Sequence, residues 1–280
     1  MVDLFNKNNY IVLLGLVIIL IILLVVKRTL INKLNKESLE IQSSSTIGKE
    51  EIQENYLEVV KAAHGTLAVL GDGLGKNEAG RISSIISVRT IVKHFLKLET
   101  INKLEYFFRK AFNDANREIL KRVDNNEGGS SVAATIIVDN LLYYALVGNI
   151  NICIFRNGEL FKLTEGHTVN VLAKNKFYEG KISKESALQV IKEKKLLYYL
   201  GQEGFGDMEI FETPIRLHKG DIVVLMNKGI YESLTWTQLE NIIYGNRKEL
   251  SLISNKIIQG VNRKKNQYCN NGSIILMKYV

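Results

Sequence analysis

The strongest hydrophobic pattern in the chain is an uninterrupted apolar run near its N-terminus. Residues Tyr10 to Val26 (YIVLLGLVIILIILLVV) contain no charged side chain. A helix rises 1.5 Å per residue, so this run and its immediate neighbours are long enough to cross a bilayer core of roughly 30 Å. We therefore expect a transmembrane helix over residues 10–30. A cleaved signal peptide is the alternative, but no small-residue cleavage site follows the run.

Basic residues next to the run indicate its orientation. Lys27, Arg28, Lys33 and Lys36 follow the apolar segment, whereas only Lys7 precedes it. Basic flanks stay on the cytoplasmic side of a membrane. The sequence thus predicts a single-pass protein of the cell membrane. Residues 1–9 would form an extracytoplasmic stub, residues 31–45 a polar linker, and residues 46–280 a cytosolic domain.

Beyond the linker, apolar spacing predicts blocks of helices and strands. A buried strand over Thr66–Leu70 precedes two helices of 3.6-residue period, over Glu78–Leu98 and Leu104–Val123. Turn signals then separate shorter segments. Strands are expected over 132–138, 141–147, 150–155, 160–163, 208–215, 222–226 and 272–279, and helices over 184–194, 235–243 and 248–260. Meandering strands and paired helices favour an α+β layered domain over a parallel doubly wound sheet.

Composition and charge exclude several classes of protein. The 280 residues are 46% hydrophobic and 24% charged, values of an ordinary globular chain. Two cysteines, Cys153 and Cys269, exclude a disulfide framework and a cysteine-rich zinc module. The net charge of +8 is spread along the chain. Without a clustered basic face and interleaved aromatic residues, nucleic acid is not an expected partner.

Candidate chemistry first appears in a glycine-rich loop. The stretch Gly71–Ser84 (GDGLGKNEAGRISS) lies between the end of a predicted strand and a long predicted helix. It offers one carboxylate, a flexible backbone and the amides of a helix N-terminus, which together suit a metal ion or an anion. Glycine loops before helices are common, so this feature alone does not define a function.

The loop and the segments after it resemble the PPM (PP2C-type) family of metal-dependent Ser/Thr protein phosphatases. The family loop D-G-M-G-G-H-x-x-G-E-x-A-S is matched without a gap at Asp72, Gly73, Gly75, Gly80 and Ser84. Further family segments follow in order at 129–131, 147–158, 163–167, 200–201 and 219–225. The resemblance spans residues 46–280. It implies an α-β-β-α sandwich, in which two antiparallel sheets are flanked by helix pairs.

The resemblance also implies a metal centre, and the chain departs from it. In the family, carboxylates from four motifs hold two Mg²⁺ or Mn²⁺ ions, which bridge the attacking water. Asp72 is retained and Gly73 follows it, whereas the other three positions hold Asn55, Lys228 and Asn270. These five residues are the degenerate metal-site positions.

A neighbouring set of residues is the candidate phosphate or partner pocket. The family's phosphate-recruiting arginine aligns with Glu50, and Lys49 stands beside it. Lys76 lies in the glycine loop. Since Lys49 and Glu50 have opposite charges, the resemblance leaves open whether phosphate binding is retained.

Charge at the metal-site positions argues against catalysis. Two divalent ions need several anionic oxygen ligands, but here Asp72 supplies one negative charge and Lys228 adds a positive one. We therefore expect no catalytic residues and no cofactor, and if any metal binds, it would use Asp72 and Gly73. We further expect Lys228 to pair with Asp72, because a buried carboxylate without its metal is costly. The alternative is that Lys228 points to solvent.

The expected function is that of a pseudophosphatase that binds and regulates a protein partner at the membrane. The partner would belong to a kinase signalling pathway or to a membrane complex. One alternative is an active, membrane-tethered Ser/Thr protein phosphatase with a rearranged Mg²⁺ or Mn²⁺ site. Another is a structural subunit of a membrane complex, for which the pocket is irrelevant. Metal dependence separates the active enzyme from the other two.

Overall fold

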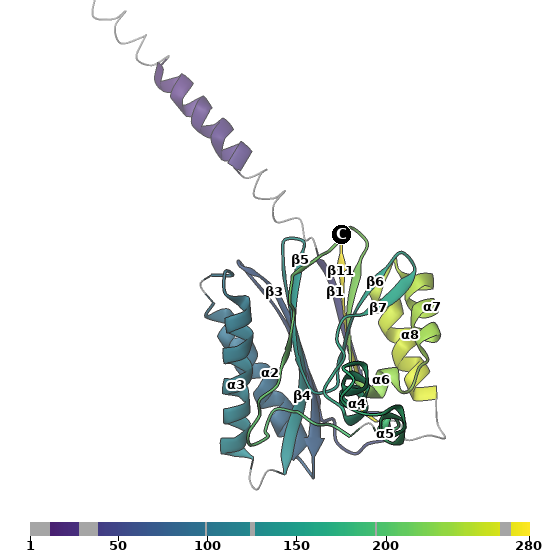
Figure 1. The fold of residues 1–280 in the computed structure, drawn as a ribbon. Helices are drawn as coiled ribbons and strands as arrows, with labels where there is room; N and C mark the ends of the chain where they lie inside the picture. Colours follow the sequence, from purple (N-terminus) through teal and green to yellow (C-terminus); the bar gives the residue numbers. More distant parts are fainter. Residues whose placement is uncertain (1–11, 28–38, 99, 124–126, 194, 264–269) are drawn as a thin grey trace, which may run out of the picture. The chain divides into compact units, whose positions relative to one another are not determined.

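The structure is a computed structural model that describes residues 12–27, 39–98, 100–123, 127–193, 195–263 and 270–280 (Figure 1). The chain divides into two units, Met1–Ser38 and Leu39–Val280. In the first unit, residues 12–27 form a helix whose side chains are almost all exposed. Among the described residues, no helix is both long enough and apolar enough to cross a membrane. The expected stub, and residues 10–11 and 28–30 of the expected span, lie outside the described residues.

Two antiparallel sheets form the centre of the second unit (Figure 1). The first has the order β1 (Leu39–Thr46), β11 (Gly272–Tyr279), β10 (Ile222–Met226), β6 (Asn151–Arg156), β7 (Glu159–Lys162). The second has the order β2 (Asn55–Ala62), β3 (Gly65–Gly75), β4 (Gly128–Val138), β5 (Leu141–Val147), β8 (Glu209–Ile210), and β9 (Ile215–Arg216) also pairs with β5. Every strand pair within these two sheets is antiparallel, as the layered α+β prediction requires.

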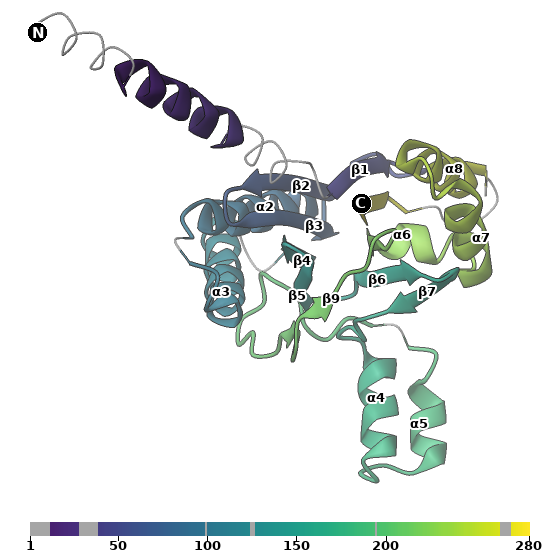
Figure 2. The same ribbon diagram turned by 90° about the horizontal axis from the view of Figure 1, so that it is seen from above.

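Helices cover the outer face of each sheet. The second sheet carries α2 (Ala79–Leu96) and α3 (Leu104–Arg122), and the first carries α6 (Lys228–Tyr231), α7 (Trp236–Asn246) and α8 (Leu250–Arg263). The α-β-β-α sandwich expected from the sequence is thereby confirmed. Two further helices, α4 (Val169–Tyr178) and α5 (Lys184–Val190), project from the sandwich as a helical hairpin (Figure 2).

Three apolar clusters fill the spaces between the four layers, and β10 shows how the sequence builds them. Its residues Ile222–Met226 (IVVLM) are all buried. Val223 and Leu225 face the other sheet, while Ile222, Val224 and Met226 face the helices. A strand with helices on one side and a sheet on the other must be apolar on both faces, which explains its continuous apolar run.

The first strand corrects the linker expected over residues 31–45. Residues 31–38 lie outside the described residues, but Leu39–Thr46 is a strand that pairs with β11 over its whole length. The serine run misled the prediction because β1 is an edge strand, where polar side chains are tolerated. Leu39 is buried against the sheets, and the Oγ atoms of Ser45 and Ser273 are 2.8 Å apart. The folded unit therefore begins at Leu39 instead of residue 46.

Candidate functional site

A pocket of about 410 Å³ lies where loops from both sheets meet. Its walls come from the segment before β2, the end of β3, the turn after β10 and the segment before β11. The pocket brings together five of the residues proposed from the sequence, namely Glu50, Asp72, Gly73, Lys228 and Asn270. Eight further residues line it: Glu54, Leu74, Ser131, Asn149, Leu196, Asn227, Gly229 and Asn271.

Asp72 is held in the pocket by an amide side chain. It lies on β3 and pairs in register with Asn55 of β2 and Ser131 of β4. The Nδ2 atom of Asn227 donates a hydrogen bond of 3.0 Å to Oδ1 of Asp72. Burial raises the pKa of Asp72 to about 6, although this hydrogen bond and the charge of Lys228 both lower it. Part of the carboxylate's acceptor capacity is thus already used by a neutral donor.

Glu54 is a second carboxylate in the pocket, which the sequence analysis did not identify. Its backbone N–H donates to Oδ1 of Asn271 at 2.7 Å, and its backbone carbonyl accepts from Oγ of Ser84 at 2.5 Å. These contacts fix the segment just before β2. Burial raises the pKa of Glu54 to about 7, and the negative charges of Asp72 and Glu50 contribute to the increase.

Amide side chains join the loops around the pocket. Asn227 is 1% exposed. Besides its bond to Asp72, its Nδ2 donates to the backbone oxygen of Asn271 at 2.9 Å, and its Oδ1 accepts from the backbone N–H of Ser273 at 2.9 Å. The Nδ2 atom of Asn271 donates to the carbonyl of Ile47 at 2.8 Å. Neutral groups therefore connect the turn after β10 with the segments around β2 and β11.

Asn55 turns toward the opposite sheet. Its Nδ2 donates to Oγ of Ser273 at 3.0 Å, and its Oδ1 is buried without a partner among the described residues. Asn55 is not one of the residues that line the pocket. Of the two asparagines at former carboxylate positions, only Asn270 is therefore in the pocket wall.

Lys228 lies in the pocket wall but does not form the expected pair with Asp72. Its Nζ is 3.8 Å from Oε2 of Glu232, one helical turn away, and its side chain is 42% exposed. Asp72 instead accepts its hydrogen bond from Asn227. Geometry explains the difference, because the preceding residue is the one that points inward from the end of β10. Lys228 acts on Asp72 as a nearby positive charge that lowers the carboxyl pKa.

The candidate phosphate pocket is only partly assembled. Glu50 lines the pocket, whereas Lys49 and Lys76 are not among its lining residues. Lys76 is exposed in the loop between β3 and α2, where its backbone N–H donates to the carbonyl of Glu127 at 3.3 Å. Glu50, Glu54 and Asp72 against Lys228 leave a formal charge of −2 on the lining residues when all are ionised. A pocket with a net negative charge does not favour the binding of phosphate.

Two glycines allow the loops to approach each other closely. A Cβ atom on Gly73 would lie 2.3 Å from the carbonyl oxygen of Gly80, at the start of α2. A Cβ atom on Gly229 would lie 2.0 Å from the backbone oxygen of Asn271. Because neither space admits a side chain, these glycines have a structural role that is independent of any ligand.

Comparison with known proteins finds similar bacterial phosphatases. No family model matches the chain. The Ser/Thr phosphatase stp of Listeria monocytogenes is 28% identical over 188 residues, which cover 65% of this chain and 73% of that protein. Protein phosphatase PhpP of Streptococcus pneumoniae is 25% identical over 213 residues, covering 73% and 84%. The chain is thus similar in sequence to bacterial protein phosphatases, among them one of the PP2C type.

Solved PPM structures have the same fold. The Ser/Thr phosphatase of S. agalactiae superposes with a TM-score of 0.75 at 20% identity, over 86% of this chain and all of that one. The catalytic domain of the phosphatase PstP, in complex with two manganese ions, has a TM-score of 0.66 at 20% identity, covering 86% and 97%. These similarities support the PPM fold of the second unit, and the manganese belongs to PstP.

The donor set of this domain, which has the PPM fold, does not fit a centre of two divalent ions. The lining residues provide three carboxylates and one ammonium group, against four positive charges on two ions. Asn55 is turned to Ser273, and Asp72 already accepts a hydrogen bond. Within the described part of the chain, no three His, Cys, Asp or Glu side chains are grouped so that they could hold a metal ion. The lining residues therefore offset only two of the four positive charges that two divalent ions would bring.

The functional residues that the sequence analysis missed are direct neighbours of positions it identified. Glu54, Asn227 and Asn271 precede or follow Asn55, Lys228 and Asn270. Side chains alternate in direction along an extended segment, so a departure at one position makes its neighbour the next candidate for the pocket. Alternation along the segment that leads into β2 could have identified Glu54. The amide network depends on loop conformation, for which the sequence offers no periodic signal.

Proposed function

We propose that this chain is a membrane-anchored pseudophosphatase, a PPM domain that binds and regulates a protein partner without hydrolysing phosphate. The observation that carries this proposal is the chemistry of the pocket wall. Where the family has carboxylates, this chain places Lys228 and Asn270, and Asn227 donates a hydrogen bond to the retained Asp72. Without bound divalent ions, a water molecule stays near its bulk pKa and is a weak nucleophile.

Calorimetric titration of the full chain in detergent with Mn²⁺, together with phosphopeptide hydrolysis on the same sample, tests this proposal. We expect no binding heat and no metal-dependent turnover at millimolar Mn²⁺. Asp72→Asn is the matched control, because it removes the retained carboxylate with little change in shape. Micromolar binding and turnover, both lost in Asp72→Asn, would overturn the proposal.

An active phosphatase with a rearranged metal site is the second candidate function. It is favoured by Glu54, whose carboxylate is close enough to Asp72 for the two charges to interact. The relatives are also named protein phosphatases. In this case a single Mg²⁺ or Mn²⁺ would be held by Glu54, Asp72 and the backbone of Gly73. The titration above distinguishes the two functions, since only this one requires metal-dependent turnover.

The anchor is part of the proposal. The apolar run of residues 10–26 and the basic residues after it support a single span over residues 10–30 with the PPM-like domain in the cytoplasm. Tethering keeps the domain at a high local concentration for a membrane neighbour, in a kinase pathway or a membrane complex. Protease treatment of intact and permeabilised cells tests the orientation. The domain should be digested only after permeabilisation. Digestion in intact cells would contradict the cytoplasmic orientation.

Partner capture through the pocket separates a regulatory module from a purely structural subunit. Asp72→Ala and Lys228→Ala change the pocket, whereas Lys176→Ala changes an exposed position on α4. Crosslinking in membranes should lose the partner in the two pocket variants and keep it in the α4 control. If all three variants capture the partner equally, the pocket has no regulatory role.

A further inference from the structure

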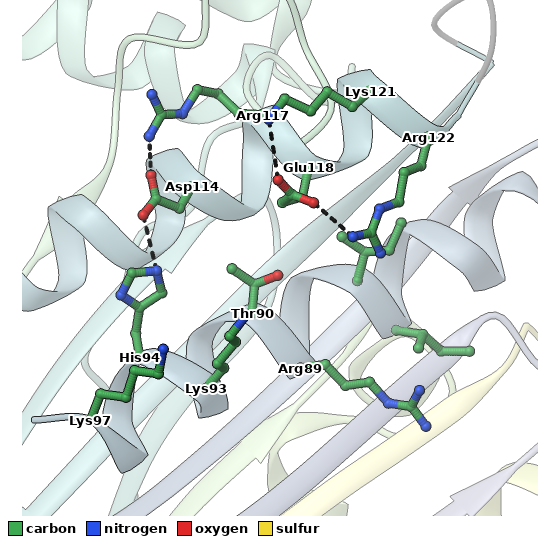
Figure 3. A pocket seen from close by; sticks show the side chains of 12 residues that line it. Arg89, Thr90, Lys93, His94, Lys97, Asp114, Arg117, Glu118, Lys121 and Arg122 are labelled. Atoms are coloured by element: carbon green, nitrogen blue, oxygen red, sulfur yellow. Dashed lines mark hydrogen bonds and ion pairs between the residues drawn. The ribbon is translucent and has the colours of Figure 1, made fainter.

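A larger groove, of about 680 Å³, lies between α2 and α3 on the outer layer of the sandwich (Figure 3). It has an apolar base that includes Ile85 and Ile86. Ten side chains that are polar or charged form the rest: Arg89, Thr90, Lys93, His94, Lys97, Asp114, Arg117, Glu118, Lys121 and Arg122. None of them belongs to the pocket described above.

The groove concentrates positive charge. Six lysines and arginines against two carboxylates leave a formal charge of +4 with His94 neutral. The whole chain carries +8. A formal charge half as large as that of the whole chain is therefore gathered in one concave surface, which the sequence alone did not reveal.

The two walls of the groove differ in how their charges are balanced. On α3, Glu118 pairs with Arg122 at 2.9 Å and with Lys121 at 3.4 Å. Asp114 pairs with Arg117 on the same helix and with Nε2 of His94 on α2, the latter at 3.0 Å. Figure 3 shows these pairs as two separate groups, one centred on Asp114 and one on Glu118. Both carboxylates of the groove, Asp114 and Glu118, thus already form ion pairs.

The α2 wall carries a row of cations without acidic partners. Arg89, Lys93 and Lys97 are exposed, and none forms an ion pair with a described acid (Figure 3). The guanidinium of Arg89 lies 5.6 Å from the centre of the Tyr56 ring, a cation–π contact that brings no formal negative charge to it. This row is the part of the groove that lacks counter-charges.

The spacing of the row favours an extended peptide. Every fourth residue of a helix advances about 6 Å along its axis. In an extended chain, every second residue advances about 6.6 Å and points to the same side. Acidic side chains at alternate positions of an extended segment would therefore face Arg89, Lys93 and Lys97 in turn.

We propose that the α2–α3 groove is a docking site for an extended, acidic segment of a partner protein, with Asp or Glu at alternate positions. Charge complementarity and the matching repeat identify this occupant. A flat anionic membrane would contact the rims of the groove and leave its base uncovered. The proposal holds whether or not the separate pocket hydrolyses phosphate.

Fluorescence anisotropy on the full chain in detergent tests the site with three labelled peptides. One repeats Glu-Ser, the second replaces each Glu by Gln, and the third has the same number of Glu residues in one block. We expect binding of the first, no binding of the second and several-fold weaker binding of the third. Lys93→Ala combined with Lys97→Ala should weaken the first by about tenfold, since each exposed ion pair contributes up to about fivefold. Salt should weaken it further.

A matched double variant, Lys110→Ala with Lys174→Ala, removes the same charge from exposed positions outside the groove. It should bind the alternating peptide like the wild type. Equal losses in the two double variants would reduce the effect to net charge and overturn the proposal. A second result would also overturn the proposal. If no peptide binds and the protein prefers phosphatidylglycerol to phosphatidylcholine vesicles in a way that depends on Lys93 and Lys97, the surface binds lipid. Circular dichroism of each variant checks that the fold is retained.

Discussion

Asn227 is the residue whose removal should most clearly reveal how the two sheets are joined. Its side chain makes three hydrogen bonds, to Asp72, to the Asn271 carbonyl and from the Ser273 N–H, and it is 1% exposed. Asn227→Ala leaves a carboxylate, a carbonyl and an N–H without this partner. At about 1 kcal/mol for each neutral bond and about 1.5–3 kcal/mol for the bond to a charged group, the expected loss of unfolding free energy is about 3–5 kcal/mol.

Asn55→Ala provides a matched control at the same junction. Asn55 is 8% exposed, makes one side-chain hydrogen bond, to Ser273, and buries an Oδ1 atom that has no described partner. Truncation removes one bond and also one unsatisfied acceptor, so the expected cost is about 0–1 kcal/mol. Urea unfolding followed by circular dichroism measures both values.

Comparing the unfolding free energies of the two variants can refute the prediction. If Asn227→Ala costs no more than Asn55→Ala, the hydrogen bonds of Asn227 do not stabilise the junction, and the argument from bond count fails. A change in the urea m-value would instead indicate that the surface exposed on unfolding has changed, so the two m-values must agree before the free energies are compared.

Three further predictions concern the charge of the pocket, the ion pair between Asp221 and Arg156, and the close approach of Gly73 to a carbonyl oxygen. Lys228→Asp combined with Asn270→Asp makes the pocket three units more negative, so calorimetry should show Mn²⁺ binding at millimolar concentration, where we expect no heat from the wild type. Asp221→Asn should lower the unfolding free energy by about 2–4 kcal/mol, because this 3%-exposed carboxylate accepts a 2.6 Å bond from Arg156, which is itself about a quarter exposed. Gly73→Ala should lower the melting temperature by several degrees, as its Cβ would meet a carbonyl oxygen at 2.3 Å. Thermal unfolding checks the last two, and no change in either would contradict them.

Much of the fold could be predicted because strongly apolar segments have one stable arrangement. The expected strands over 141–147, 222–226 and 272–279 have the observed bounds, and α2 and α3 begin and end within two residues of prediction. Segments with a weak apolar pattern were predicted less well. In α4 only Ala173 is buried, so the helix has no apolar stripe to detect. The single strand expected over 208–215 is two pairs of residues, since only short parts of it contact β5.

The candidate site was predictable in its location but not in its contacts. Motif positions placed Asp72, Lys228 and Asn270 together, and the pocket contains all three. Whether Asp72 is bonded by Lys228 or by Asn227 depends on the direction in which the chain leaves β10, which residue types do not specify. The basic groove was missed for a related reason. Its cations lie in two groups, within 89–97 and 117–122, which form one groove only when α2 and α3 pack together.

The amide junction beneath the pocket has a consequence for how the sandwich closes. A junction of carboxylates accumulates repulsion as its two sheets approach, and only counter-ions can relieve it. Asn55, Asn227 and Asn271 join the same strands with groups that carry no net charge. Assembly across these amides therefore proceeds without waiting for an ion. In a cell starved of magnesium or manganese, the hydrogen bonds of this junction would still form, because none of them needs a metal ion.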